Sequence, residues 1–213
     1  MSLLTSLFSK KLKTFFKKFR KFNAISKLDK KMLNYINFYD GYFIECGAND
    51  GVDKSNTWYF EKYLNWHGIL IEPLTKQFIE LKKNRSQKNH FYNVALCADE
   101  NINSIEIIEN DLVSKVSKNP NKFDKGKKIS NFDAMTLTKI LDEISAPNLI
   151  DFFSLDVEGY EDQVIKGINF NKYNFKFLLI ETSNDLVVNF LNNNNYSLIK
   201  KLSYHDLLFE YKK

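Results

Sequence analysis

The stretch FIECGANDG, residues 43–51, joins an apolar run to a turn that contains two glycines and an Asn-Asp pair. Phe43 and Ile44 indicate a buried strand, and Glu45 lies near its end. Glycine and asparagine tolerate positive φ, so the residues after Cys46 predict a tight polar turn. A buried strand alone does not need such a turn. We therefore expect something to approach the backbone closely at this point.

Strand-like and helix-like segments alternate on both sides of this stretch. The expected strands are short apolar runs at residues 42–47, 68–73, 90–98, 105–109, 150–159 and 175–182, with two more within 196–212. The expected helices lie at residues 56–66, 74–84, towards the end of 131–144, and at 160–168. Strands that alternate with helices imply a mostly parallel sheet covered on both faces.

The first 31 residues differ from the rest in charge. They contain ten Lys or Arg residues and one Asp, whereas residues 32–213 carry a net charge of −4. Apolar residues in this segment recur every three or four positions, at Leu4, Phe8, Leu12, Phe15 and Phe19. This spacing predicts a basic amphipathic helix, an appendage to a domain over residues 32–213. The helix either docks onto the domain or a second subunit, giving a homo-oligomer, or lies on an anionic membrane surface.

Other features bear on compartment and partners. No run of 18 apolar residues occurs, and the N-terminal charges follow the apolar residues without a cleavage site, so we expect a cytoplasmic protein. Cys46 and Cys97 lack CxxC spacing, which favours buried free thiols. No basic patch with interleaved aromatic residues recurs in the domain, so nucleic acid is not an expected partner.

Acidic residues stand at the carboxyl ends of four predicted strands: Glu45, Glu72, Asp156 and Glu181. Ligands of open parallel sheets bind outside the carboxyl ends of the strands. The coincidence predicts a ligand site that these four acids share.

The spacing of glycines and acids discriminates between nucleotide cofactors. Glu72 lies 21 residues beyond Gly51, where an acid can accept both hydroxyls of an adenosine ribose. A dinucleotide fingerprint needs glycine at positions 47, 49 and 52, and only Gly47 meets it. An acid-x-Gly-x-Gly-x-Gly pattern from Glu45 is broken only at Asn49. S-adenosylmethionine therefore fits better than NAD, although a tight turn without a ligand remains an alternative.

The segment LIDFFSLDVEGYEDQVIKGI, residues 149–168, resembles the one that marks the FkbM family of S-adenosylmethionine-dependent methyltransferases. With FIECGANDG, GILIEP, NVAL, MTL and FLLIET in the family's order, the resemblance covers roughly residues 40–185. It implies an α/β class I methyltransferase fold, Rossmann-like, with a seven-stranded mostly parallel sheet and a C-terminal antiparallel hairpin. The implied activity is O-methylation, commonly of a sugar hydroxyl in a glycan, a saccharide-lipid or a secondary metabolite.

The chain departs from the family's pattern in places. Glu45, Thr138 and Ser154 stand where the family usually has Asp, Asp and Lys, and little sequence between the motifs is left to form a substrate lid. Ser154 and Thr138 leave open the alternative of a cofactor-binding module without catalysis. The alternative enzyme is a Rossmann-type NAD or nucleotide-sugar oxidoreductase, against which the missing third glycine of the dinucleotide fingerprint argues.

We expect Glu45 to organise the methionine end of the cofactor through the loop and a water, and Glu72 to hold the ribose. The full set of expected cofactor-binding residues is Glu45, Gly47, Ala48, Asn49, Gly51, Glu72, Pro73, Asn93, Val94, Ala95 and Asp156.

The expected catalytic carboxylates are Asp156, Glu158 and Glu181, while Glu161 is interpreted as a helix N-terminal acid. An ordinary carboxylate is a weak base for a sugar hydroxyl. His205 or His67 is therefore an alternative base. A divalent cation such as Mg²⁺ on the three carboxylates is another route, because it lowers the pKa of a bound hydroxyl.

Overall fold

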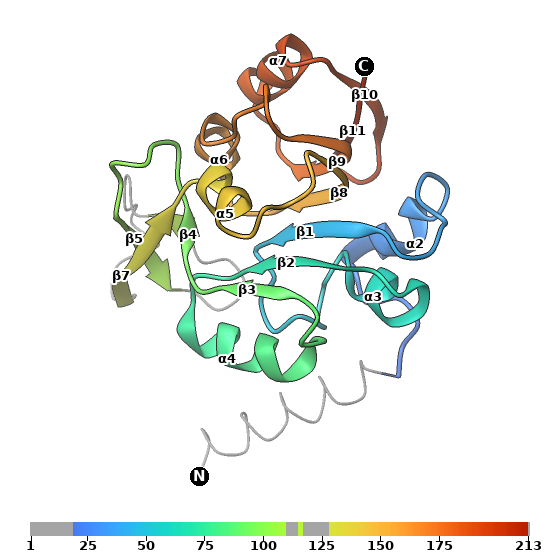
Figure 1. Cartoon of the computed structure of the whole chain (residues 1–213), viewed down its shortest axis with the longest axis horizontal. Coiled ribbons are helices and arrows are strands. Elements are labelled where there is room, and N and C mark those ends of the chain that lie inside the picture. The colour runs from blue at the N-terminus through green and yellow to red at the C-terminus, as the bar shows by residue number, and fades with distance from the viewer. Residues whose placement is uncertain (1–18, 110–114, 117–127, 213) are drawn as a thin grey trace.

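The computed structural model describes residues 19–109, 115–116 and 128–212. Its seven-stranded sheet has the order β10-β11-β9-β8-β1-β2-β3. The five strands β9, β8, β1, β2 and β3 run parallel to one another, and β11 is antiparallel to both β9 and β10. The predicted mostly parallel sheet with a C-terminal antiparallel hairpin is confirmed (Figure 1). The strands are β1 Tyr42–Cys46, β2 His67–Ile71, β3 His90–Tyr92, β8 Leu149–Leu155, β9 Asn174–Glu181, β10 Tyr196–Lys201 and β11 Asp206–Tyr211.

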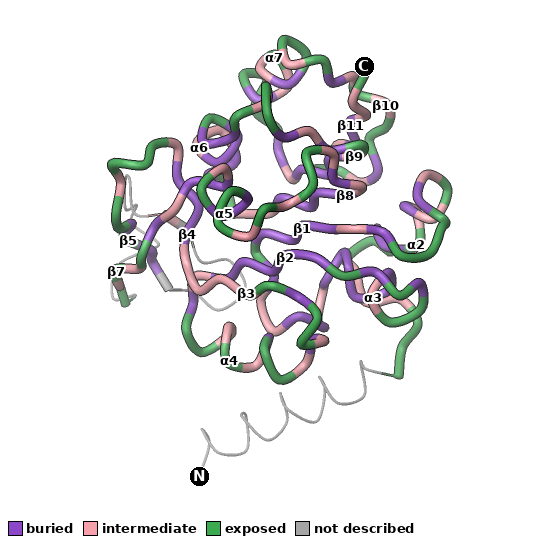
Figure 2. Tube along the Cα trace, in the orientation of Figure 1, coloured by how far each residue is buried: buried purple, intermediate pink, exposed green. Residues whose placement is uncertain are grey.

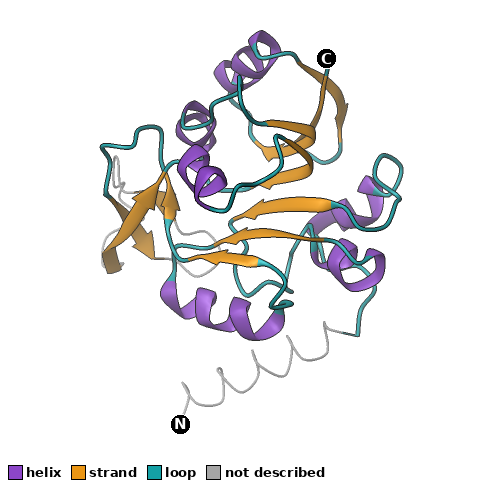
Figure 3. Cartoon of the chain, viewed as in Figure 1, coloured by secondary structure: helices purple, strands orange, loops and turns teal. Residues whose placement is uncertain are grey.

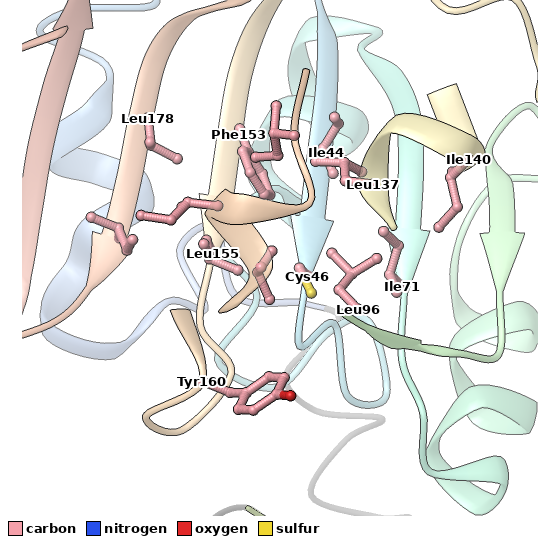
Figure 4. Packing of buried hydrophobic residues seen from close by; sticks show 14 of the residues in the cluster. Ile44, Cys46, Ile71, Leu96, Leu137, Ile140, Phe153, Leu155, Tyr160 and Leu178 are labelled. Carbon is pink, nitrogen blue, oxygen red and sulfur yellow. The ribbon is translucent and has the colours of Figure 1, made fainter. Parts of the chain in front are cut away.

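Helices cover both faces of this sheet. On one face α5, α6 and α7 pack against Ile44, Phe153 and Leu178, which lie on neighbouring strands (Figure 4). On the other face α2, α3 and α4 pack against Phe43 and Phe152. Successive side chains of a strand point to opposite faces, so the buried strands contribute to both cores (Figure 2). The helical segments are η1 Ile25–Lys27, α2 Leu28–Met32, α3 Trp58–Leu64, α4 Thr75–Asn84, α5 Leu137–Glu143, α6 Glu161–Lys166 and α7 Asp185–Asn193.

The chain between β3 and α5 forms a second, smaller sheet, with the strand order β4-β7-β5-β6. It lies beyond the carboxyl ends of β1 and β2, toward which the strand arrows point (Figure 3). Its strands are β4 Ala95–Leu96, β5 Ser104–Glu109, β6 Lys115–Val116 and β7 Lys128–Met135. The expectation that little is inserted between the motifs is therefore wrong.

Two other segments differ from the sequence-based expectations. The strand expected over residues 90–98 is broken at Asn93, because its first part pairs in the main sheet and its second part in the small one. α7 was not expected. It includes Asn192 and Asn193, the first two of four consecutive asparagines. Asn195 then turns the chain with a φ of 65°.

The N-terminal boundary of the domain also moves. Leu28 and Met32 are buried in the core beneath α3, and Phe22 stacks on Tyr59 with ring centroids 4.8 Å apart. Residues from about 22 onward thus belong to the domain, and the expected boundary after residue 31 is too late. The predicted amphipathic helix lies almost wholly outside the described residues.

Two remaining expectations are answered by the described residues. Cys46 and Cys97 are buried free thiols, as predicted. Within residues 19–109, 115–116 and 128–212, no helix has the length and apolar character needed to cross a membrane.

Candidate active site

A cavity of about 300 Å³ opens where β1, β2, β8 and β9 end. Acids at the strand ends and the loop after β1 line one part of it, and apolar residues of the small sheet line another. The predicted site residues that line it are Glu45, Gly47, Ala48, Asn49, Glu72, Pro73, Val94, Ala95, Asp156, Glu158 and Glu181. Four predicted residues lie elsewhere: Gly51, His67, Asn93 and His205.

The turn after β1 has the predicted backbone conformation. Gly47, Asn49 and Gly51 have φ values of 80°, 49° and 79°. A Cβ on Gly47 would lie 2.0 Å from the backbone oxygen of Asp156. We expected something to approach the backbone closely at this turn. At Gly47 it is the chain's own backbone at Asp156, where β8 ends beside β1.

Glu45 is buried, and both of its carboxylate oxygens accept hydrogen bonds from the chain. Its Oε2 accepts hydrogen bonds from Ser55 Oγ at 2.8 Å and Thr57 Oγ1 at 2.6 Å, and its Oε1 accepts one from the backbone N–H of Asn56 at 2.6 Å. The Arg85 guanidinium adds an ion pair at 3.2 Å. Glu45 thus shapes residues 55–57, which fits the expectation that it acts through the loop.

Arg85, at the end of α4, is the residue of this site that sequence reasoning missed most completely. Its fully buried side chain pairs with Glu45 and, at 2.8 Å, with Glu61. It also donates to Thr57 Oγ1 at 2.9 Å and to the Gly51 carbonyl at 3.2 Å. Arg85 therefore ties α3 and the loop after β1 to the end of α4.

Glu72 is buried at the edge of the cavity. Its Oε2 accepts from the backbone N–H of Asn49 and its Oε1 from that of Leu74, at 2.8 and 2.9 Å. Burial raises the pKa of Glu72 to about 7, although the two N–H donors oppose the rise. Each carboxylate oxygen can accept a second hydrogen bond, so capacity remains for ribose hydroxyls. Asn93 supports this corner, because its Nδ2 donates to the carbonyls of Glu72 and Pro73, each at 2.8 Å.

Asp156, Glu158 and Glu181, at the ends of β8 and β9, have fewer hydrogen bonds to the described residues than Glu45 and Glu72 have. Asp156 Oδ1 is buried and has no hydrogen-bond partner. Burial, together with the charges of Glu181, Glu158 and Glu161, raises the pKa of Asp156 well above its usual range. Desolvation and Glu181 also raise the pKa of Glu158, and Lys54 opposes this.

Glu161 has the role predicted for it. Its Oε1 accepts from the backbone N–H groups of Val157 at 3.1 Å and Gly159 at 3.0 Å, which closes the loop at the start of α6. This bonding supports the left-handed backbone of Glu158, whose φ is 54°.

The histidine candidates lie outside the cavity. His205 is exposed and lines an adjoining hollow of about 200 Å³, whose wall includes Glu158 and Glu181. His67 begins β2, so it lies at the opposite end of that strand from the acids. His205 therefore remains within reach of the site, and His67 is corrected to a residue outside it.

The predicted metal site finds no support in the geometry. Among the residues with described positions, no group of three or more His, Cys, Asp or Glu side chains could hold a metal ion. Asp156, Glu158 and Glu181 line the same cavity without forming such a group.

The two polar departures from the family's pattern have structural partners. Ser154 Oγ accepts from Asn56 Nδ2 at 2.9 Å, which ties β8 to the loop after β1. Thr138 Oγ1 donates to the Gly167 carbonyl at 2.9 Å and accepts from the Asn169 N–H at 2.8 Å. Thr138 therefore holds α5 to the end of α6 and is not among the residues that line the cavity.

The lining contains further residues that sequence reasoning did not single out: Ile25, Asp53, Lys54, Ser55, Asn56, Leu74, Gln77, Leu96, Ile107, Val116, Val157 and Tyr160. Ser154 also lines the cavity, and sequence reasoning noted it only as a departure from the family's pattern. Ile107 and Val116 come from the unexpected small sheet. An apolar residue of a short strand carries no signal of a ligand site, so these contacts required the fold.

Comparison with known proteins gives a consistent result. The model of the methyltransferase FkbM domain matches residues 45–198. The crystal structure of methyltransferase FkbM from Methylobacillus flagellatus KT is similar, with a TM-score of 0.52 and 18% identity over 84% of this chain and 45% of that one. This chain thus spans less than half the length of that protein. A precorrin-6y C5,15-methyltransferase from Geobacter metallireducens GS-15 has a TM-score of 0.47 at 10% identity, covering 89% of this chain and 91% of its own. No curated protein matches the sequence.

Proposed function

Because this chain belongs to the FkbM methyltransferase family, we propose that it uses S-adenosylmethionine to methylate a hydroxyl oxygen of a saccharide-like acceptor. One observation carries the proposal: acids from the ends of four neighbouring strands line one cavity. Methyltransferase membership favours this reading over hydride transfer from NAD.

The residues present fit the cofactor. Glu72 keeps acceptor capacity for the ribose hydroxyls, and Val94, Ala95, Leu96 and Ile107 offer an apolar wall for the adenine. Gly47–Asn49 and the acids after β8 remain for the methionine end. When bound, S-adenosylmethionine supplies a methyl group activated by a positively charged sulfur.

The chain's own residues must orient the acceptor and take its proton. Methyl transfer is an in-line displacement, so alignment of the acceptor oxygen supplies much of the rate. The raised pKa of Asp156 makes its carboxylate a stronger base than an exposed one, and Glu181 lies beside it. His205, on the wall of the adjoining hollow, is the second candidate base.

Calorimetry tests the cofactor. We expect S-adenosylhomocysteine to bind at micromolar strength and NAD to give no heat. Comparable heat with NAD, or none with S-adenosylhomocysteine, contradicts the assignment.

Transfer is tested with S-adenosylmethionine that carries an isotopically labelled methyl group, followed by mass spectrometry of saccharide fractions. Label is expected in a carbohydrate acceptor with the wild type and not with Asp156→Asn. The variant should keep S-adenosylhomocysteine affinity within about tenfold, or roughly 1.4 kcal/mol. Cofactor binding without labelling of any saccharide would instead support a module without catalysis.

A further inference from the structure

We infer that Asp156, Glu158 and Glu181 recognise the positive charge on the cofactor's sulfur, so that this protein binds S-adenosylmethionine more tightly than S-adenosylhomocysteine. The inference rests on the proposed cofactor. It concerns which form of the cofactor the protein retains, and it does not require the acceptor to be known.

The first observation is the bonding of Asp156. Its Oδ1 is buried without a hydrogen-bond partner, whereas the carboxylates of Glu45, Glu72 and Glu161 all accept hydrogen bonds within the chain. Buried polar groups in native proteins are nearly always satisfied, so an orphaned oxygen in a cavity wall calls for a partner from outside the chain.

The second observation is the balance of charge around the cavity. Lys54 is the only Lys or Arg among its described lining residues, and it faces Glu158. No ion pair of the described residues includes Asp156, Glu158 or Glu181. Carboxylates that share a site repel one another unless a cation offsets them. The described lining thus has more acids than cations, and in the free protein Asp156 and Glu181 can share a proton that a cationic ligand would displace.

The third observation is position. Glu72 follows β2, whereas Asp156 follows β8 and Glu181 is the last residue of β9, on the far side of β1. Neighbouring strands lie roughly 5 Å apart, so the two groups of acids are separated by the width of about two strands. With a ribose held at Glu72 and adenine against the small sheet, the remaining end of the cofactor points toward Asp156 and Glu181.

The affinities of S-adenosylmethionine and S-adenosylhomocysteine can be compared directly, because the two molecules differ little. They share the adenine, the ribose and the amino-acid group, and differ in the methyl group and the charge on sulfur. After transfer, the acids lose the cation that offset them, so they favour release of the spent cofactor.

Calorimetry on the full chain measures the effect with three probes: S-adenosylmethionine, S-adenosylhomocysteine and sinefungin. Sinefungin is unreactive, because a carbon replaces the sulfur and an amino group, protonated at neutral pH, takes the place of the methyl group. We expect S-adenosylmethionine and sinefungin to bind about tenfold more tightly than S-adenosylhomocysteine, a difference of roughly 1.4 kcal/mol. Glu181→Gln should bring the ratio near one without weakening S-adenosylhomocysteine.

Asp185→Asn is the matched control. It removes the same charge from the exposed start of α7 and should leave the ratio unchanged. If Glu181→Gln does not fold, Glu158→Gln changes an exposed residue of the same group and should also reduce the ratio.

Each remaining outcome is informative. Equal affinity of the wild type for charged and uncharged forms would overturn the inference while leaving the cofactor assignment intact. A preference that is undiminished in Glu181→Gln or in Glu158→Gln would also overturn it. If no form binds, the proposed function itself fails.

Discussion

Glu45 and Glu72, at the ends of β1 and β2, accept hydrogen bonds from the loops beside them. Among the described residues, Asp156 and Glu181, at the ends of β8 and β9, have a side-chain hydrogen bond only with each other. Glu45 accepts from three groups of the following loop and pairs with Arg85. Asp156, on the other side of the same cavity, keeps a buried oxygen without a partner. Glu45 thus stabilises the structure of the site, Glu72 combines bonds within the chain with spare acceptor capacity, and Asp156 remains for what enters the cavity. All of these residues are acids at the ends of strands. Hydrogen bonding within the chain therefore distinguishes an acid that stabilises the site from one that is available to a ligand.

Removal of Arg85 should have the largest effect. Arg85→Met leaves Glu45 and Glu61 without their cation, and breaking a buried pair in this way costs about 3–5 kcal/mol. Urea unfolding at neutral pH measures the loss. Lys83→Met is the control, because its exposed pair with Glu80 contributes at most about 1 kcal/mol. Similar losses in the two variants would contradict the role of Arg85 in stabilising the β1 side of the site.

Glu72 should give the free protein a dependence on pH. Burial raises the pKa of Glu72 to about 7 in the folded chain, above the usual value for the unfolded one. Below the unfolded pKa both states are protonated, and as pH rises toward 7 only the unfolded chain ionises, which destabilises the fold. Relative to wild type, Glu72→Gln should therefore gain up to about 3 kcal/mol between pH 4 and pH 8. Parallel unfolding curves for the two proteins would contradict the raised pKa.

Removing the charge of Glu181 should have the smallest effect, and this effect should be stabilising. Glu181→Gln takes one negative charge from beside Asp156, so it should stabilise the free protein by about 1 kcal/mol or less. Glu45→Gln, the same change on the bonded side, should cost about 1–3 kcal/mol because it disturbs buried hydrogen bonds. Thermal unfolding measures the stability of both variants. A loss of stability in Glu181→Gln as well as in Glu45→Gln would contradict the proposed difference between the two acids.

The sheet and the strand-end acids could be predicted because both are local signals. An acid that directly follows an apolar run, such as Glu72, needs no knowledge of distant contacts. Arg85 could not be predicted, because an arginine at the end of a helix ordinarily complements the helix dipole, and its pairing with Glu45 spans 40 residues of sequence.

Two other differences have equally physical causes. β7, Lys128–Met135, is largely polar and exposed, so no apolar run marks it, and the small sheet it joins was missed. The domain boundary was placed by charge, whereas burial of Leu28 and Met32 decides it.

The Arg85 contacts also bear on how fast a ligand associates. Arg85 holds Gly51, Ser55 and Thr57 in the free chain, so the loop after β1 need not become ordered on binding. Association then loses little conformational entropy in this loop, and the encounter should proceed in a single step. The observed rate should rise linearly with ligand concentration. Amide hydrogen exchange at residues 55–57 should already be slow without ligand, so the cavity behaves as a preformed receptor on its β1 side.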